Sequence, residues 1–220
     1  MSDAKETEYV SLNSSFSDIK KNDKIFQISE EETVPLKTIE IISDLLNNIC
    51  EENKDKTENI DKNIKPFMTT NIPSMPIKDY LIRLCQFTKI NESTIILILI
   101  YIDRICNFNK FTLTYRNIYK LLLSSMVVAI KYNEDNFYSS EIYAKIGGLS
   151  LKELNYLEFH FLILIKFSLF IEKELFDKYY DNIVSFTENN ESEDEEEESV
   201  EDDGDSEQYI NNNESNDNND

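Results

Sequence analysis

Two stretches of this chain would be apolar on nearly every side if they were helical. Residues 95–102 contain no charged side chain, and residues 121–130 contain only two serines among apolar residues. A helix that is apolar all round has to be buried on all sides. A simple four-helix bundle leaves one face of every helix exposed, so it fits this sequence poorly. We therefore expect an all-α fold in which other helices surround a central helix.

The segment that follows Thr114 is the best candidate for this central helix. Thr114 is the expected cap, and apolar residues then continue at helical spacing from Ile118 to Ile130. Ser125 and Ala129 are small and lie four residues apart, on one face of the helix. Their size would allow a second helix to approach this face closely.

Start and stop signals define the remaining helices. Ser150 and Glu153 form a capping box, in which each side chain bonds a free backbone N–H at a helix start. Gly147-Gly148 suit the left-handed residue that closes a helix, and Asn91 is the expected N-cap of the helix that contains residues 95–102. No convincing strand alternation occurs. Besides the central helix, we expect helices over residues 35–53, from Pro76, over 92–107, over 139–146, from Leu151 to about Phe167, and over 172–184.

Composition divides the chain into one folded centre with polar flanks. The net charge is −21, but residues 188–220 carry sixteen Asp or Glu and no Lys or Arg, which leaves about −5 for the rest. A segment so rich in like charges and so poor in apolar residues cannot form a core. The expected organisation is a disordered segment 1–34, an amphipathic helix 35–53, a linker 54–73, a helical domain 74–186 and a disordered acidic tail 187–220.

The residue inventory argues against catalysis. His160 is the only histidine, and its place between Phe159 and Phe161 favours an ordinary, partly buried helix residue. The three glycines form no phosphate-binding loop, and the ligands of a histidine-based zinc site are missing. We expect no enzyme activity, no catalytic residue, no cofactor and no metal.

Cysteine usage and hydropathy bear on the compartment. Cys50, Cys85 and Cys106 are far apart and odd in number, as expected of free thiols in a reducing compartment. No secretory signal opens the sequence, and the apolar run 95–102 is far shorter than the about 20 residues that a membrane span needs. The expected location is the nucleus, the cytoplasm or both.

Charged residues within apolar helices are the candidates for special roles. Asp103 and Arg104 end a nearly continuous apolar helix, where a charge is costly unless it is paired, so internal salt bridges are expected. Lys131 ends the expected central helix, and Glu158 lies in the capped helix. These two residues are surface charges or pair with each other, or else they form a polar hot spot aimed at the backbone of a partner. Periodicity alone favours the first interpretation.

Several motifs, in order, resemble the cyclin box, and more narrowly that of the P/U-type cyclins related to fungal phosphate-signalling cyclins. The resemblance runs from about Ser74 to Tyr180. The Asn-rich flanks are similar to proteins from AT-rich protozoan genomes. The motifs are Tyr80-Leu81-Ile82-Arg83-Leu84, Tyr101-Ile102-Asp103-Arg104, Val128-Ala129-Ile130-Lys131, Tyr143-Ala144-Lys145-Ile146-Gly147-Gly148-Leu149-Ser150, Glu153-Leu154-Asn155, Leu157-Glu158 and Phe161-Leu162.

This resemblance implies a single five-helix cyclin box built around its third helix. It implies that the chain binds a cyclin-dependent protein kinase and positions its C-helix, so that the chemistry belongs to the kinase. The regulated process is the cell cycle or nutrient and phosphate signalling. Nucleic acid, membrane and small-molecule partners are not expected. The implied kinase-binding residues are Lys131, Glu158, Leu162, Phe167 and Tyr132, and the implied internal ion-pair residues are Arg83, Asp103 and Arg104.

Some features depart from the family pattern or leave other functions open. Lys120 stands where P/U-type boxes have an arginine, and the chain turns acidic soon after Tyr180, so no second cyclin box is expected. One alternative function is an acidic-tailed helical adaptor or histone-type chaperone that binds basic proteins without a kinase. A further alternative, a hydrolase, would require His160 in a solvent-open pocket.

Overall fold

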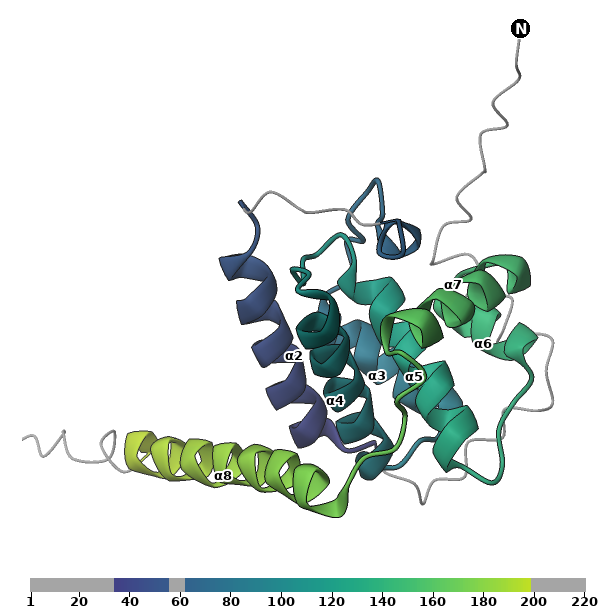
Figure 1. Ribbon diagram of the computed structural model, residues 1–220. Coiled ribbons are helices and arrows are strands. Elements are labelled where there is room, and N and C mark those ends of the chain that lie inside the picture. The colour runs from purple at the N-terminus through teal and green to yellow at the C-terminus, as the bar shows by residue number, and fades with distance from the viewer. Residues whose placement is uncertain (1–33, 56–61, 199–220) are drawn as a thin grey trace, which may run out of the picture.

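The computed structural model describes residues 34–55 and 62–198, and the side chains of these ranges as far as residue 186. Helices are the only regular elements of this part of the chain, which confirms the all-α fold (Figure 1). The expected disorder of residues 1–33 and 199–220 lies outside it. The elements are α2 (Leu36–Glu52), the 3₁₀ turn η1 (Lys65–Phe67), α3 (Ile77–Thr88), α4 (Glu92–Asn109), α5 (Ile118–Asn133), α6 (Ser140–Gly147), α7 (Leu151–Leu164) and α8 (Lys173–Glu198).

Helix α5 is the central helix that the sequence predicts. Its residues are buried from Ile118 to Ile130, with the single exception of Lys120. Helices α3, α4, α6 and α7 all pack against it. Ser125 is fully buried, and its Oγ donates a hydrogen bond to the carbonyl of Ile98 in α4 at 3.1 Å. The small face of α5 therefore allows the close approach of α4.

Several helix ends follow the expected local chemistry, although α7 ends at Leu164 and not near Phe167. The side chain of Asn91 accepts a hydrogen bond from the N–H of Thr94, and that of Ser150 accepts one from the N–H of Glu153. Gly148 closes α6 in the left-handed conformation at φ 72°. Thr114 does not cap α5, because residues 115–117 form a turn and the helix begins only at Ile118.

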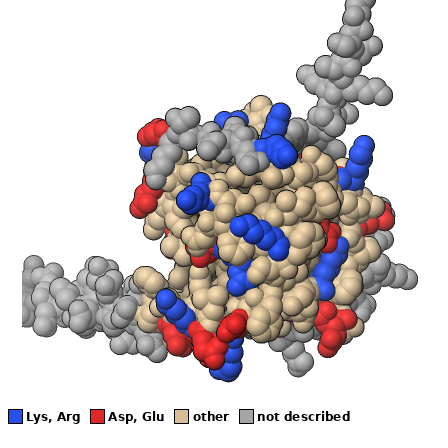
Figure 2. Space-filling view, viewed as in Figure 1, with Lys and Arg blue, Asp and Glu red and all other residues tan. Residues whose placement is uncertain are grey.

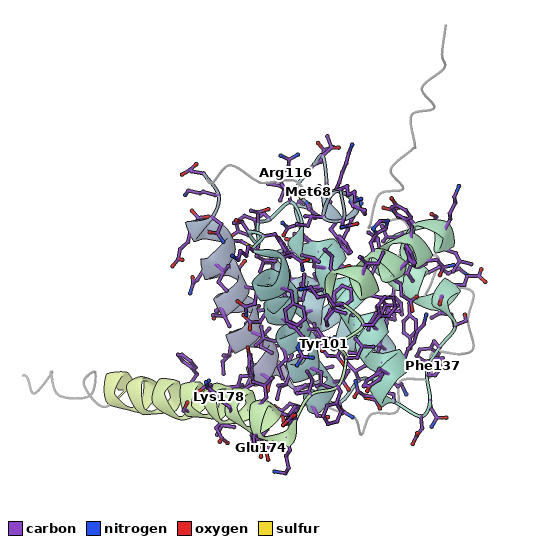
Figure 3. All side chains as sticks on the ribbon, viewed as in Figure 1. Met68, Tyr101, Arg116, Phe137, Glu174 and Lys178 are labelled. Atoms are coloured by element: carbon purple, nitrogen blue, oxygen red, sulfur yellow. The ribbon has the colours of Figure 1, made fainter. Side chains whose placement is uncertain are left out.

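Part of the expected linker 54–73 belongs to the core. Phe67 is fully buried, and Ile64 is nearly so. The N–H of Thr69 donates to the carbonyl of Arg116 at 2.8 Å, which ties this segment to the turn before α5. Figure 3 shows Met68 and Arg116 next to each other at this place. Two prolines and a single 3₁₀ turn hide the segment from arguments based on periodicity.

Helix α8 is longer than the sequence suggests. It packs against α2 and α4 and then extends away from the other helices (Figure 1). The expected end lay near Val184 and the expected disordered tail began at residue 187, but the helix continues to Glu198. No proline or glycine interrupts residues 173–198, and glutamate has a good helix propensity. None of the described helices is long and apolar enough to cross a membrane.

The contact between α6 and α5 provides a test of the packing. A Cβ atom added at Gly147 would overlap the methyl groups of Leu123, which is fully buried in α5. Alanine is otherwise the better helix former. Because the core cannot absorb the added methyl group cheaply, we expect Gly147→Ala to lower the free energy of unfolding by about 1–2 kcal/mol. Urea denaturation measures this change.

Lys145→Ala is the matched control, since Lys145 lies on the exposed side of the same helix. Its effect on the free energy of unfolding should stay within about 0.5 kcal/mol. An unchanged or increased stability of Gly147→Ala would contradict the close packing of α6 on α5.

Candidate functional site

Lys131 and Glu158 meet at the C-terminal end of the central helix. The Nζ atom of Lys131 lies 2.7 Å from both carboxylate oxygens of Glu158, and it also donates to the Oγ of Ser140 at 2.9 Å. The two charged side chains are 27% and 19% exposed. One lysine thus joins α5, α6 and α7 at a place that remains open to solvent.

The fold explains the position of this pair. The only charged residues of α5 are Lys120 and Lys131, one near each end. A positive charge in the last turn of a helix is favourable because the free carbonyls carry partial negative charge. Lys120 also pairs with α7, since its Nζ lies 3.0 Å from Glu153. The central helix is therefore joined to α7 by two lysine–glutamate pairs, one of which is the predicted site.

The apolar residues implied for the site lie on the two helices that carry the Lys131–Glu158 pair and on the segment after them. Leu162 is partly buried, one turn beyond Glu158 in α7. Tyr132 is 51% exposed and Phe167 is 66% exposed. Large exposed aromatic side chains are enriched where a protein contacts a partner. The kinase-binding roles implied for these residues remain a prediction, but their exposure is compatible with such roles.

Further exposed apolar residues of the loops and helices after α5 were not predicted from the sequence. Among the described residues, these are Phe137, Leu151, Tyr156, Phe159 and Phe170. Phe137 lies in the loop after α5, at the edge of the molecule in Figure 3. In helices and loops of mixed composition, periodicity cannot show which aromatic residues remain uncovered. The described residues therefore expose more large apolar side chains than are among the five residues implied by resemblance.

The three residues expected to form internal ion pairs differ in their environment. Arg83 is buried, and desolvation lowers the pKa of its guanidinium; its ion pair stays a prediction. Asp103 instead accepts hydrogen bonds from the hydroxyl of Tyr179 at 2.8 Å and from the amide of Asn107 at 2.9 Å.

Arg104 also differs from the expectation of an ion pair. Its Nη1 donates to the carbonyls of Ser168 at 2.6 Å and of Phe170 at 3.0 Å. Within the described part of the chain, neither Asp103 nor Arg104 forms a salt bridge. Both residues lie in the C-terminal half of α4, where their side chains are at least partly exposed. Because such a charge is not fully desolvated, neutral hydrogen-bond partners are enough to satisfy it.

The candidate catalytic histidine lies in an aromatic environment. His160 is partly buried, and the rings of Tyr156 and Phe159 contact it edge-on, with ring centroids 4.4 and 5.6 Å away. This arrangement agrees with a packed helix histidine. Over the described residues, no group of three or more His, Cys, Asp or Glu side chains could hold a metal ion.

Comparison with known proteins identifies the family. The family model named Cyclin matches residues 16–169, which is more than half of the chain. The chain belongs to the cyclin family. Cyclins are regulatory rather than catalytic proteins, and the chain is a P/U-type member with a single cyclin box. The matched region begins before α2, so the N-terminal helix expected as a separate element is part of the family domain.

Named relatives of this cyclin come from plants and fungi. Cyclin-U2-1 of Arabidopsis thaliana is 33% identical over 149 residues, which are 64% of this chain and 67% of the relative. PHO85 cyclin-like protein psl1 of Schizosaccharomyces pombe is 32% identical over 168 residues, 70% and 69% of the two chains. PHO85 cyclin-7 of Saccharomyces cerevisiae is 33% identical over 186 residues, 74% and 65% of the two chains.

The cysteines of the cyclin provide a test of reactivity. Burial raises the pKa of Cys50, Cys85 and Cys106 to about 12 each, whereas a thiol in an unfolded chain has a pKa of about 8.5. Because the thiolate is the reactive species, we expect native thiols to react with iodoacetamide at pH ~8 at least about a hundredfold more slowly than thiols of the unfolded chain. Mass spectrometry counts the modified residues.

The same chain in guanidinium chloride is the control, and there all three thiols should react. A cysteine of the native cyclin that reacts as fast as in the unfolded chain would contradict its burial.

Proposed function

We propose that this cyclin binds a cyclin-dependent protein kinase through the face that holds Lys131 and Glu158, and that it activates the kinase by positioning its C-helix. Correct placement of that helix brings its glutamate to the lysine of the ATP site, which completes the active site. The cyclin contributes no reacting group. The observation that carries the proposal is the partly exposed Lys131–Glu158 ion pair, in a chain of this family that also exposes Tyr132 and Phe167.

The geometry of the pair suits recognition of a protein backbone. An ammonium group donates and a carboxylate accepts, so together they match a carbonyl and an N–H of a partner chain. A carboxylate has about four acceptor sites, so Glu158 can accept further hydrogen bonds while it remains paired with Lys131. Since Ser140 and Glu158 already hold the lysine in place, little side-chain freedom is lost on binding.

The exposed aromatic residues supply the apolar part of the proposed interface. Tyr132 directly follows Lys131 in the last turn of α5, and Phe167 follows the end of α7, the helix that carries Glu158. Large side chains that become fully desolvated account for most of the binding energy in protein interfaces. Figure 2 shows one face on which Lys and Arg side chains are scattered over the middle and most acidic side chains lie near the edges.

We propose further that the kinase is the main partner and that the cyclin acts in the nucleus or the cytoplasm. The relatives named PHO85 cyclins favour the phosphate-signalling branch of the family. The mild charge of about −5 outside residues 188–220 gives little attraction for nucleic acid. No membrane or small-molecule partner is proposed. Nothing in the comparisons favours the alternative of an acidic-tailed adaptor.

Imaging of a fluorescently tagged full chain tests the proposed location in the nucleus or the cytoplasm, and a secreted or membrane-bound chain would contradict it.

The decisive test is a double substitution at the proposed site. We expect Lys131→Ala with Glu158→Ala to weaken binding of a cyclin-dependent kinase at least about tenfold, because both polar anchors of the interface are lost. Removing both partners avoids leaving one charge unpaired. Pull-down followed by titration measures the affinity, and kinase activity towards a peptide should fall in parallel.

The second lysine–glutamate pair of the same two helices offers a matched control. Lys120→Ala with Glu153→Ala removes an ion pair at the other end of α5 and should leave the affinity for the kinase within about twofold of the wild type. Circular dichroism verifies that both variants are folded. Equal losses in the two double variants would show that the Lys131–Glu158 pair only stabilises the fold.

A further inference from the structure

The chain after α7 forms a turn that is unusual for its sequence. Lys166 and Phe167 are consecutive non-glycine residues, and both adopt the left-handed conformation with φ 54°. Each such residue is strained by about 1–3 kcal/mol unless its surroundings hold it there. Phe167 is 66% exposed and Phe170 is 67% exposed. The strain therefore occurs where two large apolar side chains are directed into solvent.

Side chains of α4 hold the backbone of this turn. Arg104 donates to the carbonyls of Ser168 and Phe170, at 2.6 and 3.0 Å. The hydroxyl of Tyr101 donates to the carbonyl of Leu169 at 2.8 Å. These contacts satisfy three successive carbonyls, and they come from residues that lie three apart on one face of the helix.

Two further contacts extend the same arrangement. The amide of Asn109 donates to the carbonyl of Leu164, the last residue of α7, at 3.0 Å. The ammonium group of Lys166 lies 4.7 Å from the centre of the Phe108 ring, within the range of a cation–π contact. Helix α4 thus contacts the chain from the end of α7 to Phe170.

The turn also has internal hydrogen bonds that fix its shape. The N–H of Phe167 donates to the carbonyl of Leu162 at 2.9 Å, and that of Ser168 donates to Ile165 at 3.0 Å. In Figure 1 the chain leaves α7 and passes in front of the central helices before α8, and Figure 3 shows Tyr101 beneath this passage. Hydrogen bonds within the turn and from α4 hold its backbone, and Phe167 and Phe170 are its two exposed apolar side chains.

We propose that Arg104 and Tyr101 are positioning residues for kinase binding, because they hold residues 165–170 in the conformation that presents Phe167 and Phe170 to the kinase. This inference rests on the proposed function and deepens it. It adds Phe170 to the interface and assigns to Arg104 a role that it performs without touching the kinase. An internal ion pair would have placed Arg104 in the core, whereas its actual partners are the carbonyls of the turn.

Hydrogen–deuterium exchange on the free, full-length cyclin tests the positioning itself. Arg104→Ala should raise the exchange rate of peptides covering residues 165–170 about tenfold or more, and should leave peptides from α5 unchanged. Arg104→Lys can satisfy one carbonyl and should give an intermediate rate. Asp103→Ala is the matched control, because Asp103 bonds Tyr179 of α8 and not the turn. Unchanged exchange of the turn in Arg104→Ala overturns the inference.

Kinase affinity tests whether this position matters for binding. We expect Arg104→Ala to weaken kinase binding about tenfold, and Phe167→Ala with Phe170→Ala to weaken it by at least as much. If Arg104 acts only through the two aromatic residues, adding Arg104→Ala to that double variant should change affinity less than about twofold. Asp103→Ala should bind like the wild type.

The outcomes separate this inference from the proposed function. If the wild-type cyclin binds no cyclin-dependent kinase, the proposed function is wrong. The kinase is then also not the partner that Phe167 and Phe170 contact. Normal binding by the wild type together with normal binding by Arg104→Ala overturns the positioning role alone. A loss in Arg104→Ala that persists in full when both phenylalanines are absent shows that Arg104 acts by another route, and this also overturns the inference.

Discussion

The structure depends on the burial of α5 from all sides. A helix in this position cannot carry a charge in its middle, because an ionised group without a partner is too costly in an apolar interior. Its only charged residues, Lys120 and Lys131, therefore lie near the ends, and each pairs with a glutamate of α7. The same constraint that builds the core thus brings a lysine and a carboxylate to the rim, where a partner can reach them.

Two adjacent residues of helix α4 contact separate elements of the C-terminal part of the chain. Asp103 and Arg104 are adjacent in sequence, yet they hold different elements: Asp103 bonds Tyr179 of α8, and Arg104 bonds the turn after α7. Neighbouring positions of a helix point about 100° apart, so one dipeptide can contact two segments. The surface end of α4 is the point at which the C-terminal part of the chain is attached to the central helices.

The sequence was sufficient to predict features that depend on local chemistry or on complete burial. The central helix, the cap at Ser150 and the left-handed Gly148 all follow from residue type and spacing. Phe67 could not be placed in the core, because its segment has no period and its partners are distant in sequence. The contacts of Arg104 could not be predicted either. Its partners are the backbone carbonyls of residues 168 and 170, and every residue type has such a carbonyl, so the sequence does not indicate them. The Lys131–Glu158 contact was one of two open interpretations, and only the fold shows that the two residues meet.

A protein that acts on a partner without chemistry of its own depends on the rigidity of the surface that it presents. Side chains that are already fixed lose less conformational freedom on binding than mobile ones do, and this difference appears directly in the affinity. In this cyclin the lysine at the end of α5 is held by α6 and α7, and the strained turn after α7 is held by α4. The hydrogen bonds from α4 to the carbonyls after Phe167 help to hold its left-handed conformation against the strain. The residues that never touch the partner are then as important for recognition as those that do.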